Sequence, residues 1–265
     1  MGTPVDRDGS LAGLTVLVPR ARDQAGGLSV LLRARGAEAL EVPTIEIRQV
    51  ILTAELDRAV AALAAGRFDW MVLTSVNGVA AVRARAEALG LGPAALGPVS
   101  VAAVGPATEA ALRDWGVAPD LVPEVATTAA LGQAFPDRSG GPGAVLLARA
   151  DLANPALGAI LRDKGWQTSE VVAYHTVPVG ELDPAARRRL DGGEVDWVAF
   201  TASSTVEGFL RGYGGPPPAG VRVAAIGPVT ADAARSAGMG VVATAAEHTI
   251  PGLVAAIERA VARYG

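Results

Sequence analysis

Four short polar segments hold the side chains best suited to binding an anion. Two of them have the pattern Gly-Pro-x-Thr, and the other two combine Thr with Ser or Asn. Hydroxyl and amide groups donate hydrogen bonds, and the free N–H groups at a helix N-terminus attract a carboxylate or a phosphate. The candidate binding residues are Thr74, Ser75, Asn77, Gly105, Thr108, Thr201, Ser203, Ser204, Gly227, Pro228 and Thr230.

Each of these residues also has a plainer explanation. Ser, Thr and Asn are the usual N-caps of helices, each worth about 1 kcal/mol, so any one of them serves equally well as a cap. In Gly-Pro-x-Thr, the glycine lets the backbone approach a ligand closely, whereas proline suits the first turn of any helix. The occurrence of four such segments together favours a shared anion-binding site.

Two arginines are further candidates for anion binding. Arg20 and Arg149 end equivalent apolar segments, and a guanidinium there is able to grip a carboxylate through two hydrogen bonds. The alternative for each arginine is an ion pair with a nearby acid, such as Asp23 or Asp151.

Tyr174 is the candidate catalytic residue. It is one of three tyrosines in the chain and ends an apolar segment, where a phenol is able to donate a proton or orient a leaving hydroxyl. The alternative is an amphipathic side chain packed at a hinge. We interpret His175 as a surface residue and His248 as the neighbour of a helix cap.

The composition argues against several other chemistries. The 265 residues include no Cys, two His and a single lysine, Lys164, so we expect no thiolate nucleophile, metal site, Walker-type phosphate loop or cofactor. A formal net charge of −4 argues against a nucleic-acid partner. Residues 1–13 lack the apolar stretch of a signal peptide, and no apolar run approaches the roughly 18 residues of a membrane span, so we expect a cytoplasmic protein.

An alternation of β-rich and helical segments must position these residues, and it is typical of an α/β fold with parallel sheets. We expect two five-stranded sheets with helical segments between the strands, the first helix at 24–35. Ligands of such sheets bind beyond the carboxyl ends of the strands, where all four polar segments lie. The predicted strands are 15–18, 38–42, 70–74, 100–104, 120–122, 144–148, 169–173, 197–201, 222–226 and 241–244.

The chain also contains an internal repeat. Residues 99–116 match residues 221–238 at an offset of 122 (221 − 99), with 10 identities in 18 positions. We therefore interpret residues 14–139 and 143–265 as a duplication. Tyr174 has Ile45 as its counterpart, at an offset of 129 (174 − 45), so duplication alone did not place a phenol there.

Two domain arrangements are compatible with the duplication. Either each repeat forms one domain, or the repeats exchange segments and the chain crosses twice between domains. The extended, proline-interrupted segments 39–50 and 171–179 favour the exchange. We expect a discontinuous first domain of residues 1–45 plus 178–265, a second domain of residues 49–174, and linker strands at 46–48 and 175–177.

The order and spacing of these motifs resemble the uroporphyrinogen-III synthase family over residues 14–263. The resemblance rests on Val-Leu-Val-Pro-Arg ending at Arg20, Leu-Thr-Ser-Val-Asn ending at Asn77, Val-Gly-Pro-Ala-Thr ending at Thr108, Val-Val-Ala-Tyr ending at Tyr174 and Ile-Gly-Pro-Val-Thr ending at Thr230. Gln24 belongs to the same pattern. At Ala202 the chain departs from many relatives, which have Ser there, and so lacks one hydroxyl.

This resemblance implies two flavodoxin-like domains joined by a two-stranded linker. Hydroxymethylbilane, a linear tetrapyrrole with eight carboxylates, would lie in the cleft between them. The implied activity is that of a cofactor-free, monomeric lyase of porphyrin and heme biosynthesis, which closes the macrocycle with loss of water and inversion of ring D. The family tyrosine falls on Tyr174.

Two other functions stay open at this point. One is a non-catalytic, tetrapyrrole- or small-anion-binding regulatory module of the same fold. The other is a periplasmic-type two-domain binding protein, which would need a signal peptide.

Overall fold

The chain divides into two compact units. The computed structural model describes residues 9–20, 25–51 and 53–264. Unit 1 comprises Met1–Glu46 and Val177–Gly265, and unit 2 comprises Ile47–Thr176. The chain passes from one unit to the other within two strands, β3 (Ile45–Gln49) and β7 (Gln167–Pro178). Gln24 and Asp23 lie outside the described residues.

Unit 1 contains a five-stranded sheet with the order β10-β9-β8-β1-β2, and each neighbouring pair is parallel. The central strands β1 and β8 are fully buried apolar segments, as expected of parallel strands covered on both faces. Their bounds are β1 Thr15–Val18, β2 Glu38–Glu41, β8 Trp197–Phe200, β9 Arg222–Ala225 and β10 Val241–Thr244.

Helices cover both faces of this sheet. One apolar core joins the sheet to α1 and α10 through residues such as Leu28 and Ile257, and the other joins it to α7, α8 and α9 through residues such as Leu190 and Phe209. The helices are α1 Gly26–Arg33, α7 Pro184–Asp191, α8 Ser203–Tyr213, α9 Pro228–Ser236 and α10 Ile250–Tyr264.

Unit 2 contains the second five-stranded sheet, with the order β3-β7-β6-β4-β5. The pairs β7–β6, β6–β4 and β4–β5 are parallel. The three strands not yet defined are β4 Trp70–Leu73, β5 Ser100–Ala103 and β6 Ala144–Ala150.

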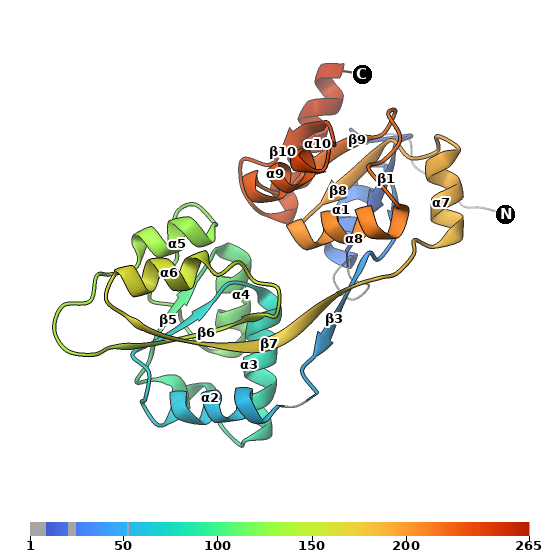
Figure 1. Cartoon of the computed structure of the whole chain (residues 1–265). Coiled ribbons are helices and arrows are strands. Elements are labelled where there is room, and N and C mark those ends of the chain that lie inside the picture. The colour runs from blue at the N-terminus through green and yellow to red at the C-terminus, as the bar shows by residue number, and fades with distance from the viewer. Residues whose placement is uncertain (1–8, 21–24, 52, 265) are drawn as a thin grey trace. The chain divides into compact units, whose positions relative to one another are not determined.

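The helices of unit 2 also form two layers. Figure 1 shows α5 and α6 on one face of the sheet and α2 and α3 on the other, and a separate apolar core fills each face. The helices are α2 Ala54–Ala64, α3 Val76–Ala88, α4 Pro106–Trp115, α5 Thr128–Ala134 and α6 Ala156–Asp163, with a short 3₁₀ turn at Pro93–Leu96. No helix of the described residues is long and apolar enough to cross a membrane.

The α/β class and the parallel sheets agree with the sequence analysis, but one predicted strand is wrong. The segment 120–122 makes only an isolated bridge between Leu121 and Ala102. Pro119 and Pro123 flank it and have no N–H to donate to a ladder. Conversely, the extended segment 39–50 forms two strands of different sheets, β2 and β3, on either side of Pro43.

Candidate functional site

The carboxyl edge of the sheet in unit 2 brings predicted site residues together. The strands β4, β5, β6 and β7 are parallel neighbours, so the segments that follow β4, β5 and β6 begin at one edge of the sheet, where β7 pairs Tyr174 with Ala150. Thr74 and Ser75 follow β4, and Gly105 follows β5. This edge is where a parallel sheet binds ligands.

Tyr174 and Ser75 are in direct contact. The Tyr174 hydroxyl lies 2.8 Å from Ser75 Oγ, and Ser75 also caps α3 by accepting a 3.0 Å hydrogen bond from the Gly78 N–H. Asn77 makes a second side-chain hydrogen bond to Tyr174. Three residues that the sequence pointed to separately therefore form one cluster.

The environment of Tyr174 keeps its phenol protonated. The side chain is nearly buried, and this burial raises the pKa of the phenol above its ordinary value. The hydrogen bonds with Ser75 and Asn77 oppose this rise in the pKa, and the negative charge of Asp151 adds to it. At neutral pH the group is therefore a neutral proton donor.

Asp151 and His175 form a polar pair beside this cluster. Asp151 Oδ2 lies 2.9 Å from His175 Nδ1, while Oδ1 accepts hydrogen bonds from the backbone N–H groups of Leu152 and Thr176. Burial raises the pKa of the Asp151 carboxyl, but these hydrogen bonds outweigh it and the pKa falls below its usual value. The sequence analysis missed this pair, although an acid at the end of β6 is a usable signal.

The two Gly-Pro-x-Thr turns are built alike in the two units. Gly105 precedes α4 and Gly227 precedes α9, and Thr108 and Thr230 in the first turns of these helices are 4% and 5% exposed. No hydrogen bond joins either threonine hydroxyl to a described residue. A buried hydroxyl without a protein partner is suited to a ligand or a water molecule.

The space beside each glycine is filled by protein. A Cβ at Gly105 would lie 2.5 Å from the Cβ of Ala126, and one at Gly227 would lie 3.1 Å from Cδ2 of His248. Both neighbours lie 21 residues downstream (126 − 105 and 248 − 227). The glycines therefore admit a packed loop, and the close approach of a ligand to their backbone stays a prediction.

Unit 1 gathers the remaining predicted residues at its own carboxyl edge. Arg20 follows β1, Thr201 follows β8 and the turn from Gly227 follows β9, and these strands are parallel neighbours. Ser203 and Ser204 open α8, whose N-cap is Ala202. Thr201, Ser203 and Ser204 are each half-buried.

Arg149 does not behave as the sequence analysis expected. Its guanidinium is buried, pairs with Glu170 and donates a 2.8 Å hydrogen bond to the Asn154 carbonyl. The proposed ion-pair partner Asp151 is thus wrong, because Glu170 lies on the adjacent strand β7. Arg149 fastens β6 to β7 through these contacts, and its binding of a ligand carboxylate stays a prediction.

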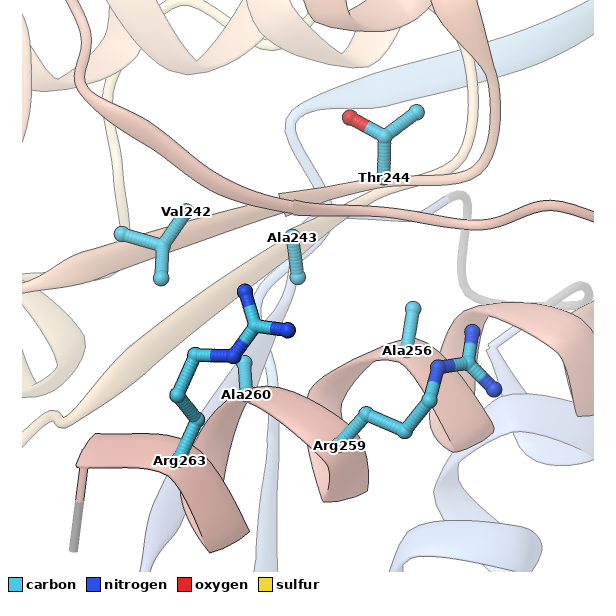
Figure 2. A pocket seen from close by; sticks show the side chains of 7 residues that line it. All are labelled: Val242, Ala243, Thr244, Ala256, Arg259, Ala260 and Arg263. Carbon is cyan, nitrogen blue, oxygen red and sulfur yellow. The ribbon is translucent and has the colours of Figure 1, made fainter.

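One hollow lies away from these residues, in unit 1. This hollow, of about 210 Å³, lies between β10 and α10. Figure 2 shows the side chains that line it, among them Arg259 and Arg263. It is lined by none of the predicted site residues. Within residues 9–20, 25–51 and 53–264, no three His, Asp or Glu side chains gather as metal ligands.

Comparison with known proteins points to one family. The family model described as "Uroporphyrinogen-III synthase HemD" matches residues 27–255. A uroporphyrinogen-III synthase of Synechococcus elongatus is 31% identical over 257 residues, covering 94% of this chain and 96% of its own length. The porphyrin biosynthesis protein HemD of Ruminiclostridium josui is 30% identical over 225 residues, which cover 85% of this chain, and the chain spans only 44% of that protein.

Solved structures give the same result. A mutant uroporphyrinogen III synthase from Thermus thermophilus superposes with a TM-score of 0.68 at 25% identity, covering 95% of this chain and all of its own. The Helicobacter pylori uroporphyrinogen-III synthetase, at 18% identity and a TM-score of 0.57, supports the fold alone; the alignment covers 91% of this chain and 97% of that one.

Proposed function

The chain belongs to the uroporphyrinogen-III synthase family, and on that premise we propose that it cyclises hydroxymethylbilane with loss of water and inversion of ring D. The observation that carries the proposal is the contact of Tyr174 with Ser75 and Asn77 at the carboxyl edge of unit 2. A nearly buried, protonated phenol at such an edge is what departure of a hydroxyl group requires.

The proton balance fits a single donor. The C–O bond of the substrate's hydroxymethyl group breaks, and the oxygen keeps the electron pair and takes a proton from Tyr174 to leave as water. Ring D attacks the resulting azafulvenium cation through its bridged α-carbon to form a spiro intermediate. The original bond from that carbon to its bridge then breaks, and ring D recloses on the freed bridge carbon through its other α-carbon. The proton that ring D loses at closure restores the phenol, so no cofactor enters the cycle.

The rest of the site positions the substrate carboxylates. The N-termini of α3, α4, α8 and α9 present free N–H groups and the positive ends of their dipoles, and Thr108 and Thr230 add unpaired hydroxyls. Ser203, Ser204 and Arg20 are further candidates on unit 1. Arg149 is left out because Glu170 already neutralises it. Holding the chain of four pyrroles in one conformation lets the inverted closure outrun the uninverted one.

One assay tests the proposal. Freshly prepared hydroxymethylbilane is added to the protein, and the products are resolved by isomer. We expect the type III isomer to form faster than the spontaneous type I product. Type I alone would contradict the enzyme assignment and leave a non-catalytic, tetrapyrrole- or anion-binding module of the same fold.

We also propose that the two flavodoxin-like domains arose by a duplication whose copies exchanged segments, with the domain and linker boundaries given above. When β3 is left out, unit 2 has the strand order β7-β6-β4-β5. This order corresponds to β2-β1-β8-β9 of unit 1 and supports the exchange. We propose further that the protein is a cytoplasmic monomer, in keeping with a highly charged, water-soluble substrate.

A further inference from the structure

We propose that Ser75 is a positioning residue, which donates its hydroxyl proton to the Tyr174 oxygen and so directs the Tyr174 proton at the substrate. This inference rests on the proposed function and assigns Ser75 a specific role in it, that of hydrogen-bond donor to Tyr174. It replaces the earlier expectation that Ser75 binds substrate.

Hydrogen-bond accounting supports this direction of donation. The 2.8 Å contact permits either hydroxyl to donate. Ser75 Oγ accepts the capping hydrogen bond from the Gly78 N–H, which leaves it one lone pair and its own proton. If Tyr174 donated instead, the Ser75 proton would have no acceptor among the described residues. With Ser75 and Asn77 both donating, the two lone pairs of the Tyr174 oxygen are occupied and its proton is available.

The duplicated half of the chain supplies an internal comparison. Ser75 corresponds to Ala202 at an offset of 127 (202 − 75), and Tyr174 corresponds to Ile45, which is buried. Both members of the hydrogen-bonded pair are therefore absent together from unit 1. This joint absence is expected if Ser75 acts through Tyr174.

The capping bond of Ser75 is not indispensable at this position. In unit 1, α8 begins at the equivalent place with Ala202 as its N-cap, whose side chain has no acceptor, and the Thr205 hydroxyl instead accepts a 3.4 Å hydrogen bond from the Ala202 N–H. The nearby Thr205 hydroxyl bonds back to the Ala202 carbonyl at 2.6 Å. A helix at this position thus forms without a serine.

The proposed step conserves protons. The Tyr174 proton passes to the departing hydroxide as the C–O bond breaks, and water leaves. The phenolate that remains is held by the Ser75 hydroxyl and the Asn77 amide until the proton from ring D returns. Ser75 keeps its own proton throughout.

A double-mutant cycle tests the inference in the full-length protein. The variants are Ser75→Ala, Tyr174→Phe and their combination, and the rate of type III formation is measured for each. We expect Ser75→Ala to lower kcat on the order of tenfold with little change in KM, because one hydrogen bond to a developing charge is lost. In the Tyr174→Phe background the same change should have almost no effect on kcat.

Three further variants separate positioning from capping. Ser75→Thr keeps both the cap and the donor and should recover most of the lost kcat. Ser75→Asp keeps an acceptor for the Gly78 N–H but has no proton to donate, so it should fold well and stay slow. Thr127→Ala removes the cap of α5, a 3.1 Å hydrogen bond from the Ala130 N–H, and should leave kcat unchanged.

A titration of Tyr174 by NMR gives a readout that needs no turnover. The chain has three tyrosines, which makes the assignment tractable. Loss of the Ser75 donor should raise the Tyr174 pKa further, whereas Ser75→Thr should not.

Three results would overturn the inference: equal effects of Ser75→Ala in both backgrounds, a raised KM with unchanged kcat, or an unchanged Tyr174 titration. If the wild type forms no type III isomer, the proposed function fails, while the titration still decides the hydrogen bond.

Discussion

At the scale of the residue, the candidate site is the nearly buried phenol of Tyr174, which has two hydrogen-bonding neighbours, Ser75 and Asn77. Its chemistry follows from burial and partners together, because burial keeps the Tyr174 proton on the phenol and the partners stabilise the phenolate that forms when the proton leaves. Burial and partners matter for Arg149 as well. Its buried guanidinium is already paired with Glu170, so a ligand carboxylate would have to compete with that partner.

Removal of the phenol oxygen is the direct test at this scale. We expect Tyr174→Phe to slow type III formation about 10²-fold, the usual contribution of a positioned general acid, without unfolding the protein. Tyr213→Phe is the matched control, since it also removes a phenol hydrogen bond, the 2.7 Å contact with Asp191. A Tyr174→Phe variant as fast as the wild type would remove the phenol from the mechanism.

The sequence predicted the members of this cluster but not their contact. Tyr174, Ser75 and Asn77 each follow or end an apolar segment, which is a local signal. The hydrogen bond between Tyr174 and Ser75 spans 99 residues and depends on β7, β6 and β4 being neighbours, which no local pattern records. The burial of Arg149 depends likewise on Glu170 in the adjacent strand.

At the scale of the element, strands were predictable wherever an apolar segment ended at a polar residue, a glycine or a proline. The strands β1 and β10 have the expected bounds, whereas β7 extends to Pro178, beyond its predicted end at residue 173. The failures occurred at short segments near prolines. The fifth strand of the sheet in unit 2 is formed by residues 45–49 and not by residues 120–122. Which segment joins the sheet depends on the edge strand that is accessible to it, and this is a property of the tertiary fold.

An ion pair between β2 and α7 provides the prediction for this scale. Arg189 grips both carboxylate oxygens of Glu38, with Nη2 2.7 Å from Oε2, and this hydrogen bond lowers the pKa of the Glu38 carboxyl. Because the Glu38 side chain is 53% exposed, we expect Glu38→Gln to reduce the free energy of unfolding at pH 7 by only about 0.5–1 kcal/mol. Urea denaturation followed by circular dichroism measures it.

The same pair predicts a pH dependence. A carboxyl whose folded-state pKa is lowered contributes stability above its unfolded-state pKa of about 4.3, and loses it as the pH falls through the folded-state value. The difference between wild type and Glu38→Gln should therefore shrink as the pH falls below about 4.3, and it should vanish once the pH lies below the folded-state pKa of Glu38. Glu87→Gln, which breaks an exposed pair with Arg83 inside one helix, should show a smaller difference at pH 7. A Glu38→Gln deficit that persists in acid would point to lost packing instead.

At the scale of the whole molecule, the two units differ in how the chain builds them. Unit 2 is one continuous stretch, whereas unit 1 is assembled from both ends of the chain. We predict that a fragment of residues 44–179, which retains β3 and β7, folds alone and unfolds cooperatively in urea. A fragment of residues 1–46 should lack a stable fold, because β1 loses its neighbour β8. A molten 44–179 fragment would show that unit 2 needs unit 1.

The central position of β1 in its sheet also determines when this strand is able to pair with both neighbours during synthesis. Its two neighbours are β2, which follows at once, and β8, which begins at Trp197. At a translation rate of about 5–20 residues per second, the 178 residues between Val18 and Trp197 (197 − 18 − 1) take roughly 10–35 s to emerge from the ribosome. Unit 2 is completed within that interval, while β1 waits with one apolar edge unpaired. Until β8 emerges, the unpaired edge of β1 must be kept from pairing with other chains. We therefore expect the yield of folded protein in a cell to depend on the speed of translation.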